Sequence, residues 1–111
     1  MKLIATTLLV GAGLALAGTV SAATAQENWD LHCAKCHAAD GSGSTKTGQK
    51  LKLKDYSKAD LQAAFTDAEA LAAIRDGVKN EAGKMTMNPY SEKLTTEEIQ
   101  ALVPFVRSLK K

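Results

Sequence analysis

The feature that most limits how this 111-residue chain can fold is one short string, Cys33-Ala34-Lys35-Cys36-His37, which contains both of its cysteines. On a helix, positions i, i+3 and i+4 lie on the same face. Two thiols and one imidazole would therefore point to a single side of a helix over this string. That arrangement suits a rigid, planar ligand bound along one edge.

The string also matches C-x-x-C-H, the attachment sequence of c-type haem. On this interpretation Cys33 and Cys36 form thioether bonds to one covalently bound haem c, and His37 is an axial ligand of its iron. The distal ligand would then come from the other side of the haem, where a methionine thioether is a soft partner that stabilises Fe(II). Met85 and Met87 are the two candidates.

Three other uses of the same residues remain open. A thioredoxin-type redox pair needs alternating strands and helices, a pattern that the sequence lacks. A structural zinc site could use both cysteines with His32 or His37, but no second pair of such ligands follows downstream. A plain disulfide between Cys33 and Cys36 is possible in an oxidising compartment. His32, one position before the motif, is expected to face solvent.

The N-terminus has the order of a secretory signal peptide. Lys2 precedes an uncharged stretch over residues 3–20, and small residues follow at 21–25. Two small-x-small cleavage sites end at Ala22 and at Ala25. We therefore expect a signal peptide over residues 1–25 and a mature domain over residues 26–111, located in the periplasm. An uncharged stretch of this length could instead stay as a membrane anchor.

The mature domain is too small to be stable without support. Domains of this size bury only about 60 to 65% of their unfolded surface and usually need a disulfide, a metal or a cofactor. Aromatic residues make up only 5% of the chain. Its net charge is +2 and no arginine-rich patch occurs, so nucleic acid is not expected as a partner.

The apolar pattern predicts an all-α domain of four helices with long loops around the haem. The first helix is expected from about Asn28 to His37. A polar loop over residues 38–56 follows, and a second loop is expected over residues 80–94. Loops this long in a compact domain usually surround something.

Helix starts after the first loop can be placed from their caps. Ser57 is a plausible N-cap for a short helix, and the pairs Thr66/Glu69 and Thr95/Glu98 are capping boxes for the next two. Gly77 marks the end of the third helix, and Pro104 is expected to kink the last one. The residues expected on the buried faces of these three helices are Leu61, Ala64 and Phe65, then Leu71, Ile74 and Val78, then Ile99, Leu102, Val103, Val106 and Leu109.

Taken together, these features resemble the class I cytochrome c family, in its small bacterial periplasmic branch. The similarity covers nearly the whole mature domain. It consists of the Cys33–His37 string, Gly41 and Gly43 in the loop that follows, Gly83-Lys84 before a methionine, and the segments 94–99 and 106–109. In the family, the ligand methionine precedes a proline-containing pair and an aromatic residue, which implies Met87 as the ligand and leaves Met85 as the alternative.

The chain departs from this family in two places near His37. Ala38 stands where the family often has glycine, and no nearby proline supplies a carbonyl for the histidine Nδ1. A backbone carbonyl from the 42–54 loop is expected to take that role. In the family the first and last helices cross where a small residue packs on an aromatic one, and Phe105 is the candidate for the ring.

The resemblance implies a one-electron carrier that shuttles electrons between membrane or periplasmic redox proteins, and not an enzyme. A six-coordinate iron with His37 and Met87 leaves no open site for a substrate, and the protein is expected to be a monomer. The alternative is an electron-entry subunit of a periplasmic oxidoreductase. Lysines are expected around the haem and could attract an acidic partner; they are Lys35, Lys46, Lys50, Lys52, Lys54, Lys79, Lys84 and Lys93.

Overall fold

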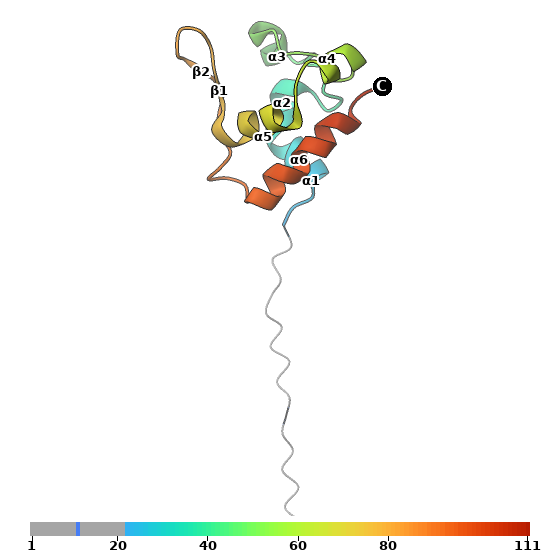
Figure 1. Cartoon of the computed structure of the whole chain (residues 1–111), viewed down its shortest axis with the longest axis vertical. Coiled ribbons are helices and arrows are strands. Elements are labelled where there is room, and N and C mark those ends of the chain that lie inside the picture. Colours follow the sequence, from blue (N-terminus) through green and yellow to red (C-terminus); the bar gives the residue numbers. More distant parts are fainter. Residues whose placement is uncertain (1–10, 12–21) are drawn as a thin grey trace, which may run out of the picture.

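A computed structural model describes residues 11 and 22–111 (Figure 1). Most of the expected signal peptide lies outside the described residues. The described chain is mainly helical, as predicted, and one short hairpin is added to the helices. In chain order the elements are α1 (Ala25–Asn28), a π-helical turn (Trp29–Cys33), α2 (Ala34–His37), α3 (Lys46–Leu51), α4 (Ala59–Ala63), α5 (Asp67–Asp76), β1 (Val78–Lys79), β2 (Met85–Met87) and α6 (Thr96–Ser108).

The first helical segment runs from α1 through the π-helical turn into α2. It starts at Ala25, three residues before the expected position, because Thr24 acts as its N-cap. The Thr24 hydroxyl accepts a hydrogen bond from the backbone N–H of Glu27, and the Glu27 carboxylate accepts one from the backbone N–H of Thr24. The segment therefore has a complete capping box that the expected start at Asn28 left out.

The core forms where α6 packs against α1 and α5 (Figure 1). The apolar stripe predicted for the last helix is buried as expected at Ile99, Leu102, Val103 and Val106. Both predicted capping boxes, at Thr66 and at Thr95, are present. α6 continues through Pro104 to Ser108. The other buried apolar side chains are Trp29, Ile74, Tyr90 and Leu94.

Helix α3 lies inside the segment expected to be a loop. Its N-cap Thr45 accepts a hydrogen bond from Gly48 N–H and also donates one to the backbone carbonyl of Cys36. A Cβ at Gly48 would lie 2.3 Å from the Gly43 carbonyl oxygen and 2.6 Å from that of Cys36. This helix was missed because it is short, and because its glycine serves close packing against the motif and carries no helix signal.

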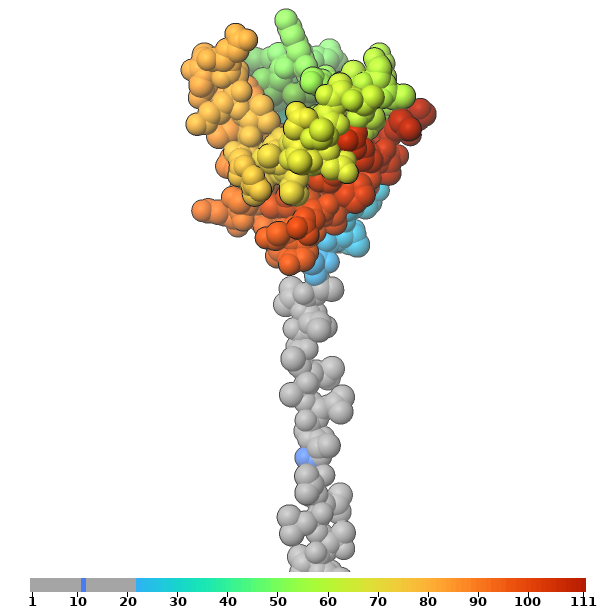
Figure 2. All heavy atoms as spheres, viewed as in Figure 1, coloured from blue at the N-terminus to red at the C-terminus, as the bar shows by residue number. Residues whose placement is uncertain are grey.

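An antiparallel hairpin of β1 and β2 extends into the second expected loop, and in it Val78 pairs with Met87 and Lys79 with Met85. The hairpin projects from the helical body at the upper left of Figures 1 and 2. Val78 was predicted on the buried face of the preceding helix, but α5 ends at Gly77, where φ is +77°, and Val78 is 40% exposed. The positive φ turns the chain out of the helix before Val78 can pack.

Helix α4 differs from the prediction in its start and in its buried face. Lys58 is the N-cap, while the Ser57 hydroxyl bonds the Asp55 carboxylate in a turn. Ala64 is exposed, and Gln62 is buried in its place. The Gln62 amide donates to the carbonyls of Tyr56 and Val106. A buried polar side chain was not predicted here because its partners lie in other parts of the chain.

Candidate functional site

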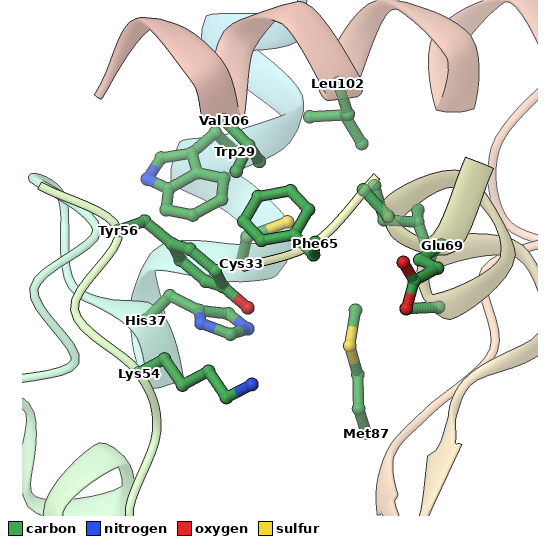
Figure 3. A pocket seen from close by; sticks show the side chains of 13 residues that line it. Trp29, Cys33, His37, Lys54, Tyr56, Phe65, Glu69, Met87, Leu102 and Val106 are labelled. Carbon is green, nitrogen blue, oxygen red and sulfur yellow. The ribbon is translucent and has the colours of Figure 1, made fainter. Parts of the chain in front are cut away.

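The described residues surround an apolar hollow of about 140 Å³, which we call the central hollow (Figure 3). It lies between the first helical segment, α5, α6 and the hairpin. A second space of about 410 Å³, the outer hollow, adjoins it and extends along the motif. The residues that line both spaces are Cys33, His37, Lys54, Tyr56 and Met87.

The two cysteines of the motif are half-buried and are not bonded to each other. Cys33 ends the π-helical turn and Cys36 lies one turn later on α2. Both border the outer hollow together with His37, so the structure brings the three motif residues to one side, as the spacing predicted. A disulfide between the cysteines is not formed.

The chain after His37 is held by backbone contacts from several elements. The His37 carbonyl accepts a hydrogen bond from Gly43 N–H at 2.8 Å. The indole N–H of Trp29 donates to the carbonyls of Ala38 and Ala39, each at 3.2 Å. These contacts fix the direction in which the chain leaves the motif.

The direction of the chain after His37 requires an unfavourable backbone conformation at Ala38. Its φ is +69° and its ψ is 160°, a region that only glycine adopts without strain. A glycine at this position would adopt the same dihedral angles without strain. The strain is local to the residue that follows the expected iron ligand.

Aromatic rings surround the His37 imidazole. The ring centroids of Trp29 and Tyr56 each lie 5.7 Å from that of His37, and Phe65 packs edge-on against Tyr56. Neither Trp29 nor Tyr56 was predicted to lie in the site. Trp29 stands four residues before Cys33 and thus on the same helix face, which was a usable signal. Tyr56 lies in a loop and carries no comparable signal.

The imidazole of His37 is poorly matched to its protein surroundings. Burial lowers its pKa below the usual value, which favours the neutral ring that metal ligation requires. Its Nδ1 atom is buried without a hydrogen-bond partner in the described part of the chain. The prediction that a carbonyl of the 42–54 loop fixes this atom is therefore wrong. Thr45 and Gly43 of that loop instead contact the motif as hydrogen-bond donors, to the backbone carbonyls of Cys36 and His37.

The electrostatics of Cys33 disfavour thiol chemistry. Burial, followed by the neighbouring Cys36, raises the pKa of its thiol to about 11, and Lys35 offsets this only in part. Thioredoxin-type cysteines have lowered pKa values, since the thiolate is the nucleophile. The high pKa and the helical fold both argue against that alternative.

The two candidate methionines lie in different surroundings, although both belong to β2. Met87 is half-buried, and its side chain extends into the central hollow from the side opposite the motif (Figure 3). Met85 is 36% exposed and lines neither hollow. Its sulfur instead lies beside Gly77, where an added Cβ would be 2.9 Å away. Of the two candidate methionines, only Met87 lines the central hollow together with His37.

The prediction that His32 faces solvent is wrong. It is half-buried and stacks edge-on against Tyr90, with ring centroids 5.6 Å apart. The Tyr90 hydroxyl donates to the His32 backbone carbonyl at 3.1 Å. This pair joins the first helical segment to the chain after β2. Among the described residues, no three side chains of His, Cys, Asp or Glu gather as a metal site.

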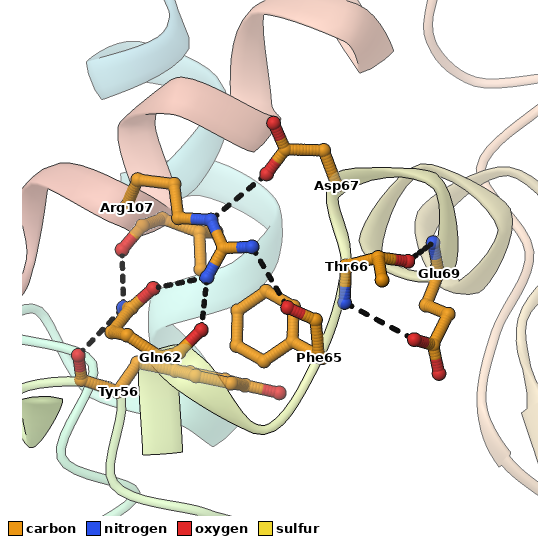
Figure 4. A network of polar contacts seen from close by, with 8 residues as sticks. Tyr56, Gln62, Phe65, Thr66, Asp67, Glu69 and Arg107 are labelled. Atoms are coloured by element: carbon orange, nitrogen blue, oxygen red, sulfur yellow. Dashed lines mark hydrogen bonds and ion pairs between the residues drawn. The ribbon is translucent and has the colours of Figure 1, made fainter. Parts of the chain in front are cut away.

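One wall of the central hollow is held by a polar network around Arg107 (Figure 4). The guanidinium donates to the carbonyls of Gln62 and Phe65 and pairs with Asp67 at 2.8 Å. It also lies over the Phe65 ring, 4.2 Å from the ring centroid. The network thus connects α6 to the segment between α4 and α5 and positions Phe65 against the hollow.

The lysines expected around the site are all exposed. Lys35, Lys52 and Lys54 line the outer hollow. Leu51 and Val78, which are 39% and 40% exposed, line it as well. The opening therefore combines positive charge with a small apolar surface.

The residues of the site fit a covalently held haem. Free thiols stand at the attachment spacing, a neutral imidazole with an unpartnered nitrogen lies beside them, and a thioether faces them across an apolar space. Soft sulfur and imidazole ligands suit haem iron. A haem bound in the hollow would add to a core that contains few aromatic residues.

Comparisons with known proteins agree with this fit. The family model described as Cytochrome c matches residues 22–110. Among solved structures, the chain is similar to "KustC0563 c-type cytochrome", with 35% identity, a TM-score of 0.71, and coverage of 80% of this chain and 100% of that one. A mutant of Kustc0563 matches with 34% identity, a TM-score of 0.68, and coverage of 79% and 100%.

No curated protein matches the chain. Within residues 22–111, no helix is both long and apolar enough to cross a bilayer. Small proteins of the cytochrome c family are haem-based electron carriers that bind haem c covalently and exchange electrons with other redox proteins. The chain belongs to this family, as a class I c-type cytochrome.

Proposed function

We propose that this protein is an exported carrier of single electrons with one haem c, attached through Cys33 and Cys36 and ligated by His37 and Met87. The observation that carries the proposal is the placement of His37 and Met87 on opposite sides of one hollow. The haem supplies reversible one-electron chemistry at its iron when bound. The chain supplies the ligands and the apolar surroundings.

The residues around the hollow support electron transfer in two ways. Trp29, Phe65 and Leu102 form apolar walls that exclude water, which favours the less charged iron state. The side chains of Thr45 and Trp29 donate hydrogen bonds to the backbone carbonyls of Cys36 and Ala38, and these bonds hold the short segment that carries His37. Rigid ligands keep the geometry similar in both oxidation states.

The attachment is tested by the intact mass of protein matured with haem and then denatured. We expect the polypeptide mass plus one haem, and haem staining that survives denaturation. Cys33→Ser and Cys36→Ser should each leave a single thioether bond, and the double variant should lose the haem on denaturation. A wild-type chain that weighs no more than its polypeptide would contradict the proposal.

The distal ligand is tested by a pair of matched variants. Met87→Leu should abolish methionine ligation and lower the reduction potential, by part of the ~0.8 V range that axial ligands control. Met85→Leu is the control and should leave spectrum and potential close to wild type, because Met85 lines neither hollow. Reduced wild-type protein should not bind carbon monoxide readily, whereas ready binding would favour the enzyme alternative. The reverse result for the two methionine variants would assign Met85.

Export and partners complete the proposal. The signal-like sequence of residues 1–25, with cleavage after 22 or 25, supports release to the periplasm, and an uncleaved anchor is the alternative. The exposed lysines at the outer hollow support an acidic redox partner, because opposite charge speeds the encounter of two proteins.

A further inference from the structure

We infer that export processing cuts the bond between Ala22 and Ala23, so that residues 23–25 remain in the mature protein and its new amino terminus lies beside Glu98. This inference rests on the signal peptide in the proposed function and decides between its two cleavage sites. It assigns a role in the folded domain to three residues that were counted as leader.

The first support is the capping box of the first helical segment. Thr24 caps this segment, and its hydroxyl and backbone N–H both contact the Glu27 side chain. Cleavage after Ala25 would remove Thr24 and leave the ammonium group of Gln26 at the start of the helix. A positive charge there opposes the helix dipole, and the backbone N–H groups lose their acceptor.

The second support is the buried amide of Asn28, which is only 2% exposed. Its Nδ2 donates to the Ala23 carbonyl at 3.4 Å and to the Glu98 carboxylate at 2.8 Å. Ala23 is therefore joined through Asn28 to the first turn of α6. Loss of residues 23–25 would leave this buried amide with one acceptor instead of two.

The third support is the charge that cleavage would create. The Asn28 side chain and then the Thr95 backbone hold the pKa of Glu98 below its usual value, and the backbone of Ala23 makes the smallest contribution. Hydrolysis adds one water: Ala22 leaves with a new carboxylate, and the Ala23 nitrogen becomes an ammonium group. No electrons are transferred. The neutral backbone group near the Glu98 carboxylate then becomes a cation, which adds a favourable charge interaction.

The signal peptidase reads the sequence before the cut bond, and residues 20–22 supply a Val-Ser-Ala site. The family model also begins to match at residue 22. The site after Ala25 would instead require the peptidase to remove residues that the domain uses. The structure thus favours the earlier of the two sites.

The test is N-terminal sequencing and intact mass of the full chain, expressed with its own leader and purified from the periplasm. We expect a chain that begins Ala23-Thr24-Ala25. A start at Gln26, or an uncleaved chain, would overturn the inference. The same mass spectrum reports the haem separately, so a chain that starts at Ala23 but lacks haem would contradict only the electron-carrier proposal.

A matched pair of leader variants sharpens the test, since neither residue remains in the mature chain. Ala22→Leu places a large residue directly before the cut bond and should reduce the Ala23 product at least tenfold. Ser21→Leu changes the tolerant middle position and should leave the product unchanged. Equal processing of both variants would overturn the assignment.

The role of the retained residues is tested by equilibrium unfolding. A variant whose mature chain begins at Gln26 should unfold with an equilibrium constant about fivefold larger or more, as expected for a lost helix cap. Thr24→Ala should reproduce much of this change. Unchanged unfolding of both variants would show that residues 23–25 have no part in the folded domain and would overturn the inference.

Discussion

The rings of Trp29 and Phe105 meet with their centroids 5.4 Å apart, where the first helical segment packs against α6. The prediction of Phe105 as the aromatic residue of this contact is confirmed, but the prediction of a small residue opposite it is wrong. Its partner is another large ring, and that ring also lies beside His37. The packing of the two terminal helices is thus connected directly to the proposed iron ligand.

This contact predicts a graded loss of stability at Trp29. Trp29→Phe keeps a ring but removes the donor to the carbonyls of Ala38 and Ala39, and it should cost about 1 kcal/mol of unfolding free energy. Trp29→Ala should cost about 3 to 5 kcal/mol because it also leaves a cavity. Guanidinium unfolding of the haem-containing protein measures both. Equal stability of the Phe variant and the wild type would show that the indole hydrogen bonds contribute nothing.

The Arg107 network predicts that lysine is a poor replacement at this position. Lysine keeps the charge but cannot reach the carbonyls of Gln62 and Phe65 together with Asp67. Arg107→Lys should therefore lower the unfolding free energy by about 1 to 2 kcal/mol. Arg75→Lys is the control, because Arg75 pairs only with exposed Asp76 and should change stability by less than about 0.5 kcal/mol. Similar losses in both variants would contradict a specific network.

Relief of strain at Ala38 should stabilise the protein. Ala38→Gly allows the observed φ of +69° without steric cost, and this gain exceeds the added entropy of the unfolded chain. We expect the free energy of unfolding, measured by thermal or chemical denaturation, to increase by about 1 kcal/mol. Ala39→Gly is the neighbouring control, since Ala39 has no positive φ, and it should be neutral or destabilising. A loss of stability in Ala38→Gly would contradict the presence of backbone strain at Ala38.

Acid should weaken the contact between the terminal helices through Glu98. Its pKa in the folded protein lies below the ordinary 4.5, chiefly because the Asn28 side chain and the Thr95 backbone donate hydrogen bonds to it. A lowered pKa stabilises the fold above the unfolded-state value, and this stabilisation is lost as the pH falls through the folded-state value. Glu98→Gln should flatten the dependence of stability on pH below about 4.5, and Glu97→Gln should not.

The lysines near the outer hollow should speed the encounter with an acidic partner. Replacing Lys35, Lys52 and Lys54 with glutamine should slow electron transfer to such a partner about tenfold at low salt, with the difference shrinking as salt is added. Stopped-flow kinetics over a range of ionic strength measure this effect. A control with Lys58, Lys110 and Lys111 replaced removes the same charge away from the hollows. Equal slowing in both would indicate net charge instead of a defined surface.

Local patterns in the sequence determined a large part of this protein. The attachment motif, the capping boxes at Thr66 and Thr95 and the buried stripe of the last helix all involve residues within a few positions of each other. Their physical basis is the geometry of one or two helical turns, so the sequence alone was sufficient. The helical class and the Cys33–His37 side of the site followed from them.

Only the tertiary structure decided which distant residues meet. Met85 and Met87 are two positions apart, and it is the hairpin and the turn at Gly77 that bring Met87 into the hollow and leave Met85 outside it. Tyr56 reaches His37, and Asn28 joins Ala23 to Glu98, through contacts that no local spacing encodes. The physical reason is that these contacts depend on how whole elements pack, and packing is set by the sum of many weak interactions across the chain.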